Sequence, residues 1–128
     1  MRPFIMLATY EDFIKQNPSC KKFERDKTMQ DIFYFLSNDF SIIQMIDASE
    51  AGRPALSPVV ENVEHFFMDL TKEYTHTLDN NFTKQAVGLM VKTILEPFGF
   101  QSASTYKYDH FAPRTMRIVK TIEEISKP

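Results

Sequence analysis

The chain has 128 residues, a length typical of one compact domain with a hydrophobic core of its own. Hydrophobic residues make up 43% of it, which argues against intrinsic disorder, and only three glycines are present, too few for the many tight turns of a β-sandwich or barrel. The formal net charge of −2 indicates no particular class of partner. We therefore expect a single, mostly helical domain over residues 1–128.

Cysteine usage and the N-terminus indicate a reducing compartment. Cys20 is the one cysteine in the chain, so no internal disulfide can form. The apolar run from Pro3 to Ala8 is too short for a signal peptide or a membrane-spanning helix. The sequence thus predicts a cytoplasmic protein with no membrane partner.

The first third of the chain carries helix signals. Thr9 and Asp12 form a TxxD pattern, similar to a capping box, that begins a short helix, and Pro18 ends it. After Thr28, two apolar runs follow at helical spacing, and they predict either two helices or one bent helix. The runs consist of Met29, Ile32, Phe33 and Leu36, and of Phe40, Ile42, Ile43 and Ile46. Gly52 and two prolines then indicate a loop over residues 48–58.

A long helix is predicted to follow this loop. Ser57 is a suitable N-cap, and Pro58 suits the first helical position, where its missing N–H is not needed. The helix is expected to reach about Thr77. Its apolar face is expected to contain Val59, Val60, Val63, Phe66, Phe67, Leu70 and Tyr74, with Glu61, Glu64, Asp69 and Glu73 on the opposite side.

The next helix has the clearest boundaries in the sequence. Asn80 or Asn81 can cap its start, and Pro97 and Gly99 end it. The expected apolar stripe contains Phe82, Ala86, Val87, Met90, Val91, Ile94 and Leu95.

The C-terminal segment allows two interpretations. Turn residues around Pro113, followed by the β-branched stretch Thr115 to Ile122, favour a two-stranded hairpin. A final helix is the alternative, because Ile118, Ile122 and Ile125 also fit a helical stripe. With the hairpin, the expected fold is α+β and mostly helical, with four or five helices and a small C-terminal β-hairpin.

Charge is distributed unevenly along the chain. Residues 28–81 contain two basic residues against nine acidic ones, whereas residues 82–120 contain six basic residues against two acidic ones. An acidic block of this kind can present carboxylates to a basic protein groove, as an inhibitor or nucleic-acid mimic does. The candidate partner-binding acidic face consists of Glu61, Glu64, Asp69 and Glu73.

The basic block supports a different hypothesis. A basic helix followed by a basic hairpin resembles the recognition helix and wing of winged-helix DNA-binding proteins, whose basic side chains neutralise phosphates. The candidate nucleic-acid-binding residues are Lys84, Lys92, Lys107, Arg114, Arg117 and Lys120. A third interpretation is that both blocks are solvated helix faces that pair with each other across the fold.

No catalytic or cofactor motif stands out. Glu61, His65, Asp69, Glu73 and His76 follow one another at spacings of four, four, four and three, and Glu73 and His76 form an ExxH pair. One helix rarely completes a metal site, so we expect no metal. Phosphate-binding glycine loops and the GxSxG nucleophile motif are absent from the sequence. The sequence predicts a non-enzymatic protein without a cofactor.

One stretch resembles a known group of proteins. Ala86 to Lys92, Ile94 to Phe100 (ILEPFGF) and Ser102 to Tyr106 look like small uncharacterised proteins of conjugative elements and phages of low-GC Gram-positive bacteria, over about residues 81–106. The resemblance implies a mobile genetic element. The expected function is a non-enzymatic interaction protein that binds and inhibits or regulates a host protein or nucleoprotein partner, in the manner of an anti-CRISPR protein. A winged-helix-like DNA-binding transcriptional regulator is the alternative.

Overall fold

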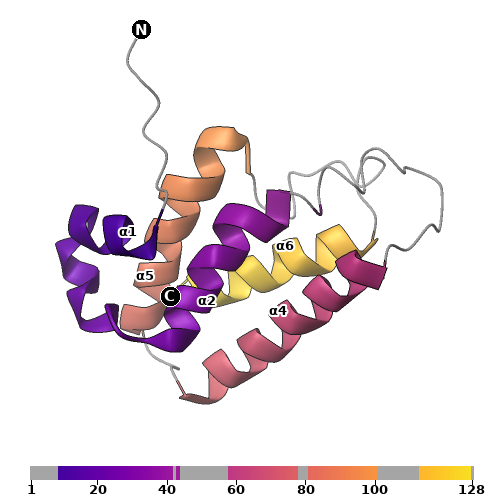
Figure 1. Ribbon diagram of the computed structural model, residues 1–128, viewed down its shortest axis with the longest axis horizontal. Coiled ribbons are helices and arrows are strands. Elements are labelled where there is room, and N and C mark those ends of the chain that lie inside the picture. Colours follow the sequence, from indigo (N-terminus) through magenta and orange to yellow (C-terminus); the bar gives the residue numbers. More distant parts are fainter. Residues whose placement is uncertain (1–8, 42, 44–57, 78–80, 101–112, 128) are drawn as a thin grey trace, which may run out of the picture.

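The computed structural model describes residues 9–41, 43, 58–77, 81–100 and 113–127, and this part of the chain is helical, with no β-strand in it. Figure 1 shows the α-helices α1 (Tyr10–Gln16), α2 (Lys27–Tyr34), α4 (Pro58–Thr77), α5 (Asn81–Met90) and α6 (Pro113–Ser126). Two short 3₁₀ helices, η1 (Pro18–Phe23) and η4 (Glu96–Phe98), and two π-helical turns, η2 (Phe35–Asp39) and η3 (Val91–Leu95), accompany them. The expectation of a mostly helical chain is confirmed, whereas the loop predicted over 48–58 lies outside the described residues except for Pro58.

The first helix begins and ends where its local signals predict. The Thr9 hydroxyl accepts a hydrogen bond from the Asp12 N–H at 3.1 Å, and Pro18 starts η1 directly after the helix. Tyr10 connects the two elements, because its buried hydroxyl donates to the Phe23 carbonyl at 2.5 Å. Burial raises the pKa of the Tyr10 phenol, so this group stays a neutral donor.

The second helical region is continuous. Helix α2 starts at Lys27, because the Asp26 carboxylate caps it by accepting from the Met29 N–H at 3.1 Å. It passes directly into η2, and helical structure continues to Ser41. The first apolar run and Phe40, the first residue of the second run, thus belong to one helical segment. Ile42 and Ile46 lie outside the described residues.

Helices α4 and α5 have the boundaries that the sequence predicts. Helix α4 begins at Pro58 and ends at Thr77, and α5 begins at Asn81. Helix α5 continues through η3 and η4 to Gly99, whose φ of 93° places it in the left-handed region that glycine adopts without strain.

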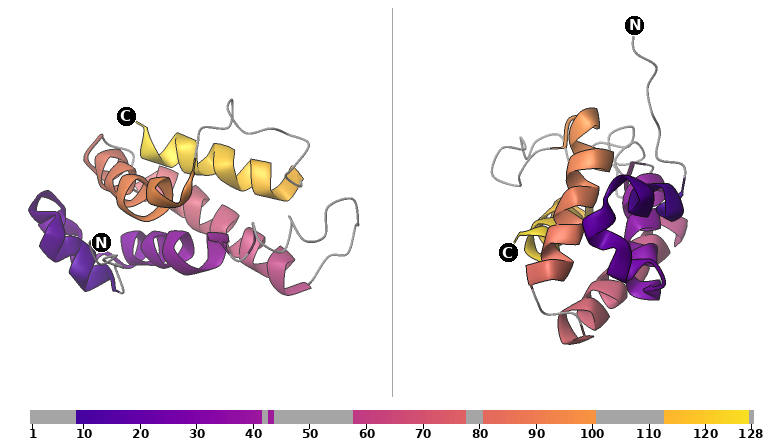
Figure 2. Two further views of the ribbon diagram at one scale, coloured as in Figure 1. Left: turned by 90° about the horizontal axis from the view of Figure 1, so that it is seen from above. Right: turned by 90° about the vertical axis from the view of Figure 1, so that its left-hand side faces the viewer.

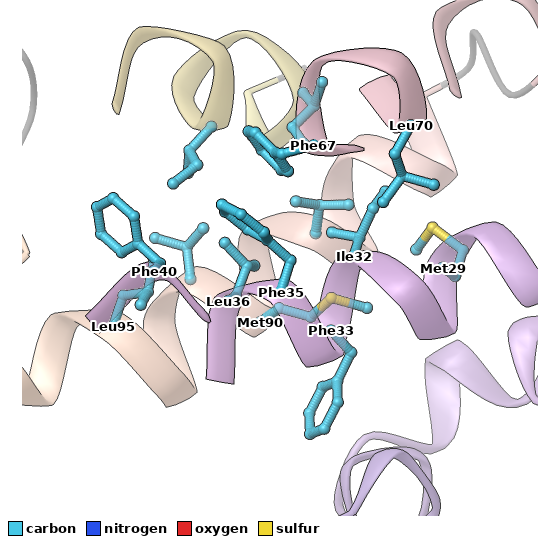
Figure 3. Close-up of a cluster of buried hydrophobic side chains, with 14 of the residues drawn as sticks. Met29, Ile32, Phe33, Phe35, Leu36, Phe40, Phe67, Leu70, Met90 and Leu95 are labelled. Atoms are coloured by element: carbon cyan, nitrogen blue, oxygen red, sulfur yellow. The ribbon is translucent and has the colours of Figure 1, made fainter. Parts of the chain in front are cut away.

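The core forms where α2, η2, α4, α5 and η3 meet. Figure 3 shows side chains from these elements pointing toward one another, and the stacked rings of Phe35 and Phe67 lie at its centre, 3.9 Å apart and 12° from parallel. The two π turns, η2 and η3, contact each other at this core. The core therefore ties the N-terminal half of the chain to the helices that follow.

Helices α4 and α6 run in the same direction. Glu64 pairs with Arg117, the Thr121 hydroxyl contacts the Met68 sulfur at 3.7 Å, and the Tyr74 hydroxyl donates to the Ile125 carbonyl at 3.1 Å. Because both members of each pair advance together along the sequence, the two helices are parallel. Figures 1 and 2 show α6 lying alongside α4, and α6 also packs on α5.

The predicted C-terminal β-hairpin is wrong. Residues 115–122, expected to form its second strand, belong to α6, and the residues expected to form its first strand lie outside the described part of the chain. The reason is burial: Ile118, Ile122 and Ile125 form a helical stripe that is removed from solvent against α4 and α5. Burial of such a stripe outweighs the modest preference of β-branched residues for strands. The helix alternative is the one that the structure contains.

Candidate interaction surface

An ion pair joins the two charged blocks of the sequence. The Arg117 guanidinium contacts one carboxylate oxygen of Glu64 through both Nη2, at 2.7 Å, and Nε, at 2.9 Å. The Glu64 side chain is only 9% exposed, whereas that of Arg117 is 58% exposed. Pairing across the fold, one of the three interpretations of the charge pattern, is therefore present at this position.

This pair corrects the predicted acidic face. Glu64 was expected on an exposed face with Glu61, Asp69 and Glu73, but it is buried between α4 and α6. Glu64 and Glu73 are nine residues apart, which is about two and a half helical turns, so they lie on opposite sides of α4. The four acids therefore do not form one surface.

A narrower surface remains on the solvent side of α4. Asn62, Phe66, Asp69 and Glu73 recur at spacings of four, three and four, so they form one straight line along the helix, and all four are exposed. We call these four residues the outer strip of α4. The exposed His65 lies beside it, whereas Glu61 is exposed farther around the helix. Helix α4 forms one edge of the helical assembly in Figure 1, so the strip faces away from the core.

Phe66 distinguishes the outer strip from an ordinary solvated helix face. It was expected in the apolar face, but it is 50% exposed, while the adjacent Phe67 is completely buried. Among the described residues, no aromatic ring or cation is recorded against the Phe66 ring. An aromatic side chain that becomes fully desolvated on binding can anchor a protein interface, and the exposed Phe66 ring is available for such a role.

Phe82 is the other large exposed hydrophobic side chain in the described part of the chain. It was also expected in an apolar stripe, yet it is 61% exposed, and Thr83 occupies the buried position instead. The Lys22 ammonium lies 3.6 Å from the centre of the Phe82 ring, in a cation–π contact between η1 and α5. The Phe82 ring thus has a cationic partner within the fold, and the described residues contain no such partner for the Phe66 ring.

The described members of the predicted basic set lie on three elements, α5, η3 and α6. Lys92 is exposed on η3, Lys84 is partly buried on α5, and Lys120 is exposed on α6 next to Glu124. Arg117 is held by Glu64, Arg114 belongs to the first turn of α6, and Lys107 lies outside the described residues. The wing that a winged-helix reader would need is not formed by residues 113–126, which are helical.

The described residues contain no group of three or more His, Cys, Asp or Glu side chains that could hold a metal ion. His76 lies in the last turn of α4, but its side chain is outside the described part. Cys20 is buried, and burial raises the pKa of its thiol, which disfavours the reactive thiolate. No helix in the described ranges is both long enough and apolar enough to cross a membrane.

No protein-family model, curated protein or solved structure matches this chain.

The exposure of Phe66, which sequence reasoning missed, has only a weak signal in the sequence. Phe66 lies in line with Asn62, Asp69 and Glu73, three polar residues, and a single aromatic residue in a polar line is more often exposed than one flanked by apolar residues.

Proposed function

We propose that this protein is a non-enzymatic interaction protein that docks on a partner protein through the outer strip of α4. The exposed Phe66 side chain in the middle of that strip is the observation that carries the proposal. Fully desolvated aromatic side chains supply much of the binding energy at protein interfaces. On this proposal, the Phe66 ring inserts into an apolar pocket of the partner.

The carboxylates of the strip indicate the charge of the partner. Asp69 is the nearest acidic neighbour of Phe66 along the strip, and Glu73 follows one turn later. An apolar pocket flanked by Lys or Arg side chains complements this arrangement, since opposite charges at the rim of an interface accelerate association and fix its register. A helix lying in a groove is a common geometry for such an interface.

The resemblance of residues 81–106 to proteins of mobile genetic elements suggests the kind of partner. On that basis the proposed role is to inhibit or regulate a host protein or nucleoprotein complex, as an anti-CRISPR protein does. Nucleic-acid machinery is rich in basic protein grooves, and an acidic strip fits such a groove. This narrower role is supported by the resemblance and by the charge of the strip.

The test compares two exposed phenylalanines. Partners are captured from a lysate of the source organism with the wild-type chain, then purified and titrated by calorimetry against Phe66→Ala and Phe82→Ala. Loss of an interface anchor lowers affinity by about thirtyfold or more, so Phe66→Ala is expected to bind that much more weakly. Phe82→Ala, the matched control, is expected to retain affinity within about threefold.

Charge-reversal variants of the outer strip test whether its carboxylates contribute to partner binding. Asp69→Lys with Glu73→Lys should slow association and weaken binding, and Glu124→Lys on α6 is the control. The proposal is wrong if Phe66→Ala and Phe82→Ala bind the partner equally well. The DNA-binding alternative is tested by a gel shift with random duplex DNA at low salt, where phosphate contacts must produce a complex.

A further inference from the structure

A second exposed surface lies where η1 meets the first turn of α5, on the left side of the view in Figure 1. The Lys22 ammonium lies 3.6 Å from the centre of the Phe82 ring and 5.4 Å from that of Phe23. Phe23 is buried, whereas Phe82 is 61% exposed even with Lys22 against it. This surface therefore presents an aromatic ring and a cation side by side to solvent.

Arg25 belongs to the same surface. The hydrogen bonds of η1 continue past its last residue, because the Asp26 N–H donates to the Phe23 carbonyl at 3.0 Å. Side chains three residues apart lie on the same side of a 3₁₀ helix, about 6 Å apart along its axis. Lys22 and Arg25 have this spacing, and both are exposed. Together with Phe82 they form what we call the η1 surface.

The carboxylates nearest to these two cations in the sequence are held by other contacts. Glu24 pairs with Lys21 at 2.9 Å, and the pKa of its carboxyl is lowered chiefly by Lys21 and further by the charge of Arg25. The Asp26 carboxylate caps α2. In the described part of the chain, neither Lys22 nor Arg25 takes part in an ion pair. The η1 surface thus offers two positive charges beside the exposed ring.

From this arrangement we propose that the η1 surface binds single-stranded nucleic acid. One base stacks on the exposed Phe82 ring, and two successive phosphates contact Lys22 and Arg25. Proteins bind single strands without sequence preference by combining basic side chains with aromatic rings on which bases stack. An acidic protein segment would also complement the two cations, but its carboxylates have no flat ring to stack on Phe82, so the surface favours nucleic acid.

This inference does not rest on the proposed docking of α4. The outer strip belongs to α4, whereas the η1 surface belongs to η1, the residues just after it and α5. The two surfaces have no residue in common, and their ligands differ in charge, since the outer strip is acidic and the η1 surface is basic. Each proposal can therefore fail without the other.

The experiment is a fluorescence-anisotropy titration of the full chain with a short labelled oligothymidine at low salt. Oligouridine of equal length distinguishes RNA from DNA as the source of the strand. An abasic oligonucleotide presents phosphates without bases, and oligoglutamate presents carboxylates. Saturable binding of the thymidine or uridine strand is expected, with the abasic strand about tenfold weaker. For two contacted phosphates, the logarithm of the binding constant should fall with that of the salt concentration with a slope of about −1.4, or about −0.7 for each phosphate.

The two exposed phenylalanines again provide matched variants. Phe82→Leu is expected to weaken oligothymidine binding by about tenfold, whereas Phe82→Tyr, which keeps the ring, should retain it. Phe66→Leu, on the other surface, should change it by less than about twofold. Arg25→Gln should reduce the salt slope to about −0.7, and Lys120→Gln on α6 should leave it unchanged. Thermal unfolding checks that each variant is folded.

Three results would overturn the proposal. The first is the absence of binding at low salt, where phosphate contacts must be strongest. The second is binding of the abasic strand or of oligoglutamate as tightly as oligothymidine, because the Phe82 ring would then not stack on a base. The third is equal affinity of Phe82→Leu and Phe66→Leu. A partner preparation free of nucleic acid keeps these results separate from the calorimetric test of the outer strip.

Discussion

The solvent-facing sides of α4 and α6 look complementary in sequence, one acidic and one basic, but the structure uses them differently. On α6, Arg117 is held by Glu64, and the exposed Lys120 lies one turn before the exposed Glu124, so the basic side of this helix is not a row of unpaired cations. On α4, the same ion pair removes Glu64 from the surface but leaves Asp69 and Glu73 in line with the exposed Phe66. Acidic residues that are close together in a sequence therefore form an acidic surface only where they are not buried in ion pairs within the fold.

The largest expected effect is a difference in stability between variants on the buried side of α4, at Phe67, and variants on its exposed side, at Phe66. Phe67→Ala should destabilise the protein by about 3–5 kcal/mol, because it removes a buried ring stacked on Phe35, whereas Phe66→Ala should change stability by less than about 1 kcal/mol. Urea denaturation measures both, and Phe67→Leu provides a smaller measurable loss if the alanine variant does not fold. Equal losses for the two positions would mean that Phe66 is not an exposed residue.

The ion pair between the two helices should have the next largest effect. Arg117→Met should cost about 1–3 kcal/mol, because the Glu64 carboxylate then stays buried without its partner. The higher costs measured for fully buried pairs are not expected, since the Arg117 side chain is 58% exposed.

Two further variants complete this test by urea denaturation. Glu64→Leu combined with Arg117→Met should recover most of the loss, because both charges are then replaced by apolar groups. Lys120→Met is the control on the same helix and should stay within about 0.5 kcal/mol of wild type. If Lys120→Met lowers the free energy of unfolding as much as Arg117→Met does, the loss at Arg117 does not come from its ion pair with Glu64.

The contact between Lys22 and Phe82 should have a smaller effect. A double-mutant cycle with Lys22→Met and Phe82→Leu should show a coupling of about 0.5–1 kcal/mol, typical of an exposed cation–π pair. Thermal unfolding of the four proteins measures it. Zero coupling would mean that the Lys22 contact does not stabilise the fold through Phe82. Phe82 would then not differ from Phe66 in having a stabilising partner within the protein.

The smallest effect concerns Asp39, a partly buried residue of η2. Burial raises the pKa of this carboxyl above 3.8, so the folded state holds the proton more tightly than the unfolded state. Wild-type stability should therefore fall relative to that of Asp39→Asn as the pH rises above 3.8 through the folded-state pKa. Denaturation midpoints across this range measure the difference, and a difference that does not change with pH would contradict the assignment.

Much of the helical framework could be predicted because its signals are local. Thr9, Pro58 and Gly99 act through their own backbone geometry or through the next turn, and each marks a helix boundary that the structure contains. The C-terminal segment could not be resolved this way. Its β-branched residues favour a strand and its spacing favours a helix, and burial against α4 and α5 decides between them.

The candidate surface was predicted only in part. Asp69 and Glu73 are exposed as expected, but the exposure of Phe66 and the burial of Glu64 depend on which elements cover each side of α4. The partner of Glu64 is 53 residues farther along the chain, beyond the reach of any local pattern.

The sequence by itself therefore determined where α1, α4 and α5 begin and end, since caps, prolines and apolar spacing act within one or two turns. Tertiary structure decided that residues 115–122 form a helix, that Glu64 is paired with Arg117, and that Phe66 is exposed. The physical reason is that burial and ion pairing depend on contacts between elements distant in sequence, which form only when the helices pack together.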